Sequence, residues 1–356
     1  MSSEEIHLVS ESPPKVISCP MAGCGVENPE GEEFCLKCGA PLTEEAQTTP
    51  TPAETVPEKS STPADPLAIE EMRFLTAVPY PVSLTSHGLT HPGLSGKNNE
   101  DAFVVDGAFF PKHNIDIRFA IVADGMGGEK AGEILGNMAV HDIARGLWFL
   151  MPSFEQHLDF ERLDFWRFAT GQFSRFLCNQ VATANTTVRN YGKAKKLKSG
   201  NYGATVVLAV AVCDLDLGHV QIYGFVSGDP RCYMILDDAV TQLSEDQTIG
   251  GKPSSFLGAH DHLTGKGFSQ EIWMGQESIN SLTLLLCSDG FWNMLGPDSY
   301  PQFTKRDARR IANAALKASL EVQEPYGRQF DPKVQTGDDN NTLAILKLSA
   351  SLKGAE

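Results

Sequence analysis

The sequence predicts an α+β fold in which helices cover the faces of antiparallel sheets. Closely spaced apolar segments with a two-residue period, joined by short turns, indicate antiparallel strands. Segments with a helical apolar period fall in two separated blocks, and no repeating βαβ pattern is present. The chain has 356 residues, of which 41% are hydrophobic and 21% charged. This composition predicts a water-soluble protein with a large core.

The elements follow from these periods in chain order. Strand patterns are expected from residue 82 onward, over the apolar residues that end at Asp124, over 204–212, 219–227 and 231–236, up to Cys287, and over 342–348. Helical stripes, with apolar residues three and four apart, predict helices from about 131 to 150, from 154 to 190 and from 306 to 322.

The acidic charge of the chain is concentrated near its N-terminus. The formal net charge is −16; residues 1–80 contain 14 Asp and Glu against 4 Lys and Arg, a net of −10, which leaves −6 for the rest. Without a basic stripe, binding to nucleic acid or to an anionic membrane is not expected. No apolar run approaches the roughly 20 residues of a membrane span, and the first residues do not resemble a signal peptide. We therefore expect a cytoplasmic protein.

Composition divides the chain into four parts. Residues 1–15 are expected to be disordered, 16–42 to form a zinc ribbon, 43–79 to be a disordered linker rich in Pro, Thr and Glu, and 80–350 to form the main domain. Four cysteines in the second part have the spacing C-x(4)-C-x(10)-C-x(2)-C, at Cys19, Cys24, Cys35 and Cys38. Four thiolates complete the tetrahedral shell of one structural Zn²⁺, which would supply most of the folding free energy of so short a segment. The alternative is a pair of disulfides.

Acidic residues next to Gly or Asn recur beside apolar strands. Asp124 ends a strand and is followed by Gly125, Asp289 follows a second strand, Asp339 precedes the last one, and Glu100 and Asp101 lie upstream. Carboxylates and backbone carbonyls in such turns suit hard cations such as Mg²⁺ or Mn²⁺. Any single one of these Asp residues could instead be a turn or cap residue.

Seven ordered segments between about residues 82 and 348 resemble the metal-dependent (PPM, or type 2C) Ser/Thr protein phosphatases. They are 99–102 (NEDA), 124–128 (DGMGG), 203–205 (GAT), 227–231 (SGDPR), 243–248 (LSEDQT), 287–290 (CSDG) and 339–342 (DNNT). The resemblance implies two central antiparallel sheets flanked by helices, with a site for two Mg²⁺ or Mn²⁺ ions at one end of this PPM-type phosphatase domain. Met126, where eukaryotic members tend to carry His, implies a bacterial source.

The resemblance also implies residue roles. Asp124 would bridge both ions, Gly125 would offer its carbonyl to one of them, Asp289 and Asp339 would be direct ligands, and Glu100 and Asp101 would hold metal-bound waters. A hydroxide bridging the two ions would then hydrolyse phosphomonoesters. The implied partners are proteins phosphorylated on Ser or Thr, and with them a Ser/Thr kinase and its substrates. The partner of the zinc ribbon is not indicated.

The sequence departs from the family pattern in three places. Gly96 stands where the phosphate-clamping Arg is usual, so we assign a phosphate-holding catalytic role to Lys97, which offers a point charge but no bidentate fork. Gly200 replaces the Asp that binds a third metal. The segment 249–266 lacks a helical stripe, which indicates a shortened flap.

Other chemical groups are given structural or solvent-exposed roles. We expect Gly228-Asp229 to form a structural turn, His260–His262 to face solvent, and Cys178, Cys213, Cys232 and Cys287 to be core thiols. The departures keep two alternative functions open. One is a weak or inactive domain that acts as a phosphoprotein-binding scaffold, and the other is a phosphatase of small phosphoesters.

Overall fold

The computed structural model describes residues 16–18, 27–29, 81–94, 98–127, 131–158, 162–198, 200–274, 279–327 and 339–350. The chain divides into two compact units, Met1–Ala64 and Asp65–Glu356. In the first unit, strand β1 (Val16–Ser18) pairs antiparallel with β2 (Glu27–Pro29). The cysteines predicted to bind zinc lie outside the described residues, and the boundaries 1–15, 16–42 and 43–79 remain predictions.

The described part of the second unit contains two five-stranded antiparallel sheets. The first has the order β12-β7-β6-β5-β4, with bounds β4 Asp101–Phe110, β5 Ile115–Met126, β6 Gly203–Asp214, β7 His219–Ser227 and β12 Lys266–Trp273. The second has the order β3-β14-β13-β8-β9, with bounds β3 Val82–His91, β8 Arg231–Leu236, β9 Ala239–Gln242, β13 Ser281–Cys287 and β14 Asn341–Ala350. A small pair, β10 (Thr248–Ile249) and β11 (Lys252–Pro253), lies between β9 and β12 in sequence.

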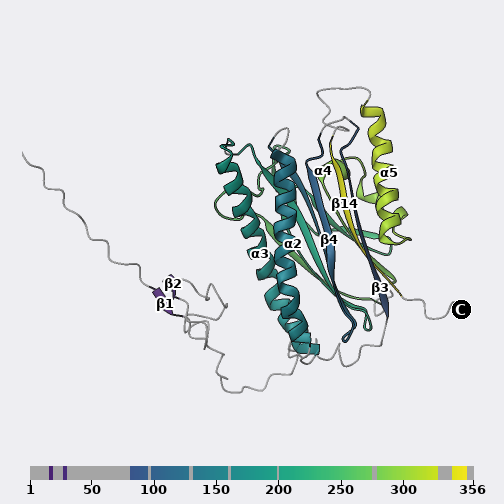
Figure 1. Ribbon diagram of the computed structural model, residues 1–356. Coiled ribbons are helices and arrows are strands. Elements are labelled where there is room, and N and C mark those ends of the chain that lie inside the picture. The colour runs from purple at the N-terminus through teal and green to yellow at the C-terminus, as the bar shows by residue number, and fades with distance from the viewer. Residues whose placement is uncertain are drawn as a thin grey trace, which may run out of the picture. The chain divides into compact units, whose positions relative to one another are not determined.

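Helices cover the outer faces of both sheets (Figure 1). Helices α2 (Ala131–Leu158) and α3 (Arg162–Ala194) pack on the first sheet, and α5 (Ala308–Gly327) packs on the second. The short helix α4 (Asp289–Trp292) and the 3₁₀ helix η1 (Pro297–Phe303) connect β13 to α5. The fold is thus a four-layer α+β sandwich, and the predicted class and pair of antiparallel sheets are confirmed.

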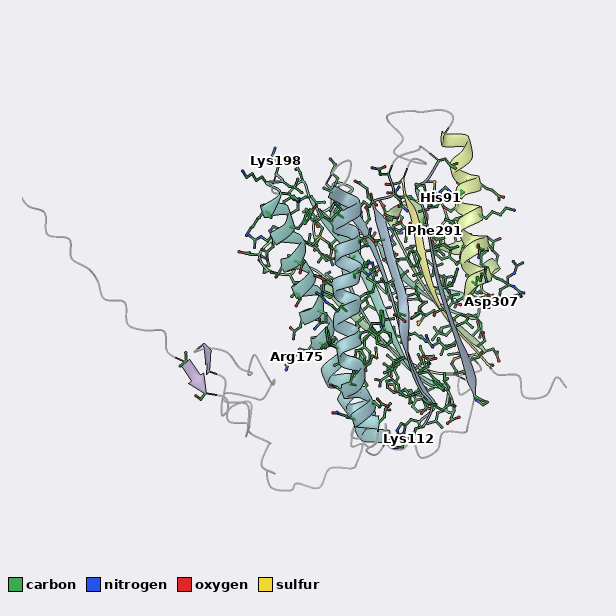
Figure 2. The ribbon with its side chains drawn as sticks, viewed as in Figure 1. His91, Lys112, Arg175, Lys198, Phe291 and Asp307 are labelled. Carbon is green, nitrogen blue, oxygen red and sulfur yellow. The ribbon has the colours of Figure 1, made fainter. Side chains whose placement is uncertain are left out.

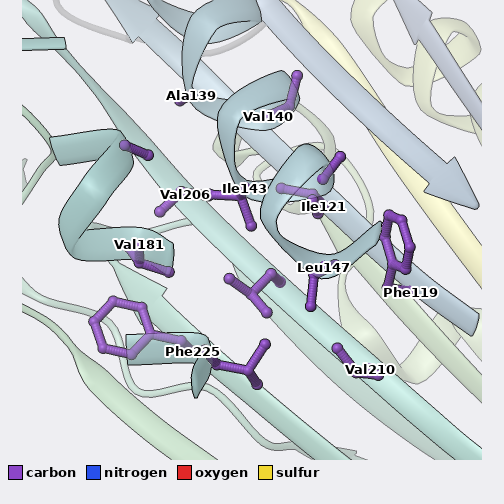
Figure 3. Close-up of a cluster of buried hydrophobic side chains, with 14 of the residues drawn as sticks. Phe119, Ile121, Ala139, Val140, Ile143, Leu147, Val181, Val206, Val210 and Phe225 are labelled. Atoms are coloured by element: carbon purple, nitrogen blue, oxygen red, sulfur yellow. The ribbon is translucent and has the colours of Figure 1, made fainter. Parts of the chain in front are cut away.

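The period-two pattern of β6 shows how the layers are held together. Every residue of β6 is buried, because one face of the strand meets the helices and the other meets the second sheet. Val206, Leu208, Val210 and Val212 join the core under α2 and α3, whereas Val207, Ala209, Ala211 and Cys213 join the core between the sheets. Figure 3 shows the first of these cores, in which Ile143 and Leu147 of α2 lie over Ile121 and Val206. Each fully buried Val or Leu side chain contributes about 1.5–3 kcal/mol, so the strands beside Asp124 are firmly fixed.

Candidate active site

The predicted acidic segments converge at one end of the sandwich. Asp101 and Asp124 are register partners on β4 and β5 of the first sheet, while Asp289 follows β13 and Asp339 precedes β14 in the second. The two sheets are joined here, because the Ser288 hydroxyl donates to Asp101 Oδ2 at 2.7 Å and also accepts from the backbone N–H of Thr342 at 3.1 Å. In Figure 2, His91 and Phe291, which belong to neighbouring segments, mark this end.

The glycine after Asp124 permits a close approach of two backbones. The N–H of Gly125 donates to the carbonyl of Glu100 at 3.1 Å. A Cβ at Gly125 would collide with the carbonyl oxygen of Gly132, in the first turn of α2. The residue at 125 must therefore be Gly so that α2 can begin beside the Asp124 strand end.

Asn340 connects three segments of the site through one side chain. Its Oδ1 accepts from the N–H of Glu100 at 2.8 Å, and its Nδ2 donates to the carbonyls of Pro92 and Asn98 at 3.1 and 3.2 Å. Its own N–H donates to Asp339 Oδ1 at 2.9 Å. From the sequence, Asn340 is identified only as the neighbour of Asp339. Its place directly after that Asp is the one sequence signal that points to its positioning role.

Burial, followed by mutual repulsion, dominates the electrostatics of the carboxyl groups. Burial raises the pKa values of Asp101 and Asp124 well above the usual range, and the charges of Asp289 and Asp339 raise both further. Burial and then the charges of Asp339 and Asp229 raise the pKa of Asp289 to about 7. The leading charges that act on Asp124 all come from other carboxylates, so the ionised cluster requires cations for stability.

The donor set fits hard divalent cations. Within the ranges that the structure describes, no three His, Cys, Asp or Glu side chains are grouped as a ready-made ligand shell. Mg²⁺ keeps several water ligands and uses few protein carboxylates, so spaced carboxylates beside the Gly125 carbonyl suit it. The separate roles assigned to these residues remain predictions.

Asp229 belongs to this electrostatic cluster although its sequence indicated only a turn. It is buried, and burial followed by the charge of Asp246 raises its pKa to about 6. The Trp292 indole donates to the Asp229 carbonyl at 3.0 Å, which fixes the turn to the helix that begins with Asp289. Sequence reasoning missed this link because it joins segments 63 residues apart.

Protein groups hold the guanidinium of Arg231, which directly follows this turn. Arg231 donates from Nε and Nη2 to the Asp246 carboxylate at 2.6–3.1 Å and from Nη1 to the Tyr233 hydroxyl at 3.0 Å. It also stacks over the Trp292 ring, with its Cζ 3.5 Å from the ring centroid. These contacts give Arg231 a structural role.

The three sequence departures have different structural outcomes. Gly96 and Lys97 lie outside the described residues, so the phosphate-holding role of Lys97 stays a prediction. Gly200 is described: it follows α3 with φ +82°, and no heavy atom lies within 4 Å of where its Cβ would stand. The segment 249–266 contains no helix, in agreement with its lack of a helical stripe; besides loops it holds part of the β10–β11 pair, the bridge of Leu257 with Ala204 and the first residue of β12. The shortened flap remains a prediction.

The expected surroundings of the remaining groups are mostly confirmed. The residues His260–His262 are exposed, and Cys213, Cys232 and Cys287 are buried. The prediction for Cys178 is wrong, because this thiol is exposed. Cys178 follows Leu177, which belongs to the buried stripe of α3, and one residue along a helix turns the side chain about 100° away from that stripe.

Comparisons with known proteins agree with this architecture. The serine/threonine phosphatase Stp of Listeria welshimeri is 25% identical over 290 residues, covering 75% of this chain and 97% of that protein. The solved serine/threonine phosphatase PstP of Mycobacterium tuberculosis superposes with a TM-score of 0.53 at 19% identity, covering 74% of this chain and 97% of that one. The fold is that of bacterial Ser/Thr phosphatases.

A second PstP structure places metal ions in this fold. The PstP catalytic domain in complex with two manganese ions superposes with a TM-score of 0.52 at 19% identity, covering 75% of this chain and 99% of that chain. No family model matches the sequence. Among the described helices, none combines the length and apolar character needed to cross a bilayer.

Proposed function

We propose that this chain is a metal-dependent phosphatase of proteins phosphorylated on Ser or Thr. The observation that carries the proposal is the convergence of Asp101, Asp124, Asp289 and Asp339 at one end of the sandwich, where burial and then the charges of neighbouring carboxylates raise the pKa values of the buried members. A protein gains nothing from gathering carboxylates that repel one another unless cations bind them. The similarity to Stp and the shared fold support the same activity.

Each residue of the site has a proposed task. Asp124, Asp289 and Asp339 would hold two Mg²⁺ or Mn²⁺ ions together with the Gly125 carbonyl, while Glu100 and Asp101 would hold metal-bound waters. Such ions supply an activated water and neutralise charge on phosphoryl oxygens. Ser288 fixes the Asp101 carboxylate, and Asn340 fixes the Glu100 backbone. Lys97 would attract the substrate phosphate as a point charge.

The test compares Asp124→Asn with Asp298→Asn, a control on the exposed first turn of η1. Turnover of a phosphopeptide and of an aryl phosphate is measured with Mn²⁺ and with chelator. We expect the wild type and the control to hydrolyse the phosphopeptide with Mn²⁺ only, and a folded Asp124→Asn protein to be inactive. Wild-type turnover by that variant would contradict the metal assignment. Phosphopeptide binding without turnover would favour the scaffold, and preference for the aryl phosphate would favour a small-phosphoester phosphatase.

We also propose that the N-terminal unit binds one structural Zn²⁺ through Cys19, Cys24, Cys35 and Cys38. The pairing of Ser18 with Glu27 supports this idea, because it closes the segment that contains the first two cysteines. Metal analysis of the full chain should find about one zinc. Deletion of residues 1–66 should remove the zinc while phosphatase activity stays, and a folded but inactive truncation would contradict a separable module.

A further inference from the structure

A second polar site lies on the outer face of the second sheet, where α5 begins. A pocket of about 560 Å³ is formed there by the ends of β3, β13 and β14, the turn between β8 and β9, and residues 304–310. Lys347 on β14 is six residues beyond Asn341, which is about 20 Å along a strand. The pocket is therefore separate from the acidic cluster, as the places of His91 and Asp307 in Figure 2 also show.

Strand register provides the pocket with a polar floor. Lys347 is paired with Thr85 on one side and Thr283 on the other. The next row on the same face is formed by three serines, Ser83, Ser349 and Ser281. Leu343 and Ile345 of the same strand pack under α5, so the alternate residues Lys347 and Ser349 face the α5 side, beyond its first turn. Hydroxyl groups thus replace the apolar residues that line the rest of this face.

Lys347 is the unusual member of the floor. Its side chain is only 3% exposed, and its ammonium has no hydrogen-bond partner among the described residues. Burial lowers its pKa to about 8, although the charge of Asp237 acts in the opposite direction. The Asp237 carboxylate already accepts backbone N–H groups of Asn280 and Ser281. A buried ammonium that lines a pocket and lacks a partner indicates a missing anion.

The rim of the pocket supplies further positive charge. Lys305, Arg306 and Arg310 line it together with three carboxylates, Asp237, Asp238 and Asp307. Arg310 Nε lies 3.5 Å from Asp307 Oδ2. With Lys347, the lining thus carries four cationic groups against three carboxylates. Two of the first N–H groups of α5 are not available to a ligand. The backbone N–H of Ala308 donates to Thr85 Oγ1, and the backbone N–H of Arg310 donates to Asp307 Oδ1. An anion in the pocket would therefore be held by side chains and not by the helix end.

We propose that this pocket binds a phosphate group, with the Lys347 ammonium and the floor hydroxyls beneath it and Arg306 and Arg310 at the rim. Guanidinium and ammonium groups donate strong charge-assisted hydrogen bonds to phosphate. The volume lies in the range of small-molecule pockets, roughly 300–1,000 Å³, so it has room for the organic part of a phosphate monoester as well as for free phosphate. The site does not depend on the proposed phosphatase activity.

The test measures binding by calorimetry to the full chain, treated with chelator so that the acidic cluster holds no metal. Inorganic phosphate and glycerol phosphate are titrated at constant ionic strength. Lys347→Met removes the floor charge, Arg306→Gln removes a rim charge, and Lys198→Met is the matched control at an exposed lysine near the end of α3.

We expect saturable binding by the wild type and the control. Loss of a charge-assisted bond should weaken binding by roughly tenfold or more in Lys347→Met and by several-fold in Arg306→Gln. Tighter binding of glycerol phosphate would identify an organic phosphate as the ligand, and equal binding would identify free phosphate. The proposal is overturned if the wild type shows no saturable binding of either probe, or if a folded Lys347→Met protein binds both as tightly as the wild type.

Discussion

Replacing Lys347 by Met should stabilise the ligand-free protein. The pKa of Lys347 falls from 10.5 to about 8 on folding, and each pKa unit is worth about 1.4 kcal/mol. Charging the buried ammonium therefore costs the folded state about 3 kcal/mol at pH 7. Met has a similar length and no charge, so Lys347→Met should raise the free energy of unfolding by about this amount, less any loss of packing.

The pH dependence distinguishes this charge effect from improved packing. Because the folded pKa lies below the unfolded one, the penalty is fully present below pH 8 and disappears as pH rises toward 10.5. At pH 9.5 the gain of Lys347→Met should have fallen to about 1.4 kcal/mol. Urea unfolding in phosphate-free buffer with chelator, at pH 7 and pH 9.5, measures both values. The exposed control Lys198→Met should change the free energy of unfolding by less than about 0.5 kcal/mol.

Two results would refute this reasoning. One is a Lys347→Met protein that is less stable than the wild type at pH 7, and the other is a gain of the same size at both pH values. Added phosphate should reduce the gain, because a ligand that binds only the folded wild type stabilises it by mass action.

Three further predictions concern the candidate active site. In the metal-free protein the melting temperature should fall as pH rises from about 4 to 7, because the folded pKa of Asp289, about 7, exceeds its unfolded value. Bound Mn²⁺ should abolish this fall. If the melting temperature changes equally with pH with and without Mn²⁺, the prediction is wrong. Ser288→Ala should weaken Mn²⁺ binding by roughly 10–100-fold, since the Ser288 hydroxyl fixes the Asp101 carboxylate. An unchanged Mn²⁺ affinity, measured by calorimetry, would exclude that role. Lys97→Ala should raise KM for aryl phosphate, and steady-state kinetics with unchanged KM and kcat would show that Lys97 does not hold the phosphate.

Local patterns predicted the elements whose burial is regular along the chain. The strand before Asp124 and the stripes of α2 and α3 are buried as their periods indicate. Strand β12 was not predicted, because at the edge of its sheet most of its residues are exposed and polar and give no alternation. Strand β4 was represented only by its acidic start, since Gly107 and a run of half-buried residues obscure its period.

Contacts between distant segments could not be predicted in the same way. The acidic motifs were found because each carries its own signal, an Asp beside Gly or Asn at a strand end. The polar pocket carries no such signal: Lys347 appears as one lysine near the end of an apolar strand. Its importance comes from the register that places Thr85 and Thr283 beside it, and register between segments more than 60 residues apart is a property of the whole sheet.

The Asn340 amide has a consequence for how this enzyme could diversify. The segment that begins at Pro92 and ends at Asn98 has both of its ends tied to this one side chain, and the same side chain holds the backbone of Glu100. Gly93, next to the first anchor, is constrained as well, because its φ is +77° and a Cβ there would collide with the carbonyl oxygen of Asp339. A substitution that displaces Pro92, Gly93 or Asn98 would therefore also displace the backbone of Glu100 or Asp339, so changes in this segment and in the acidic cluster are expected to occur together.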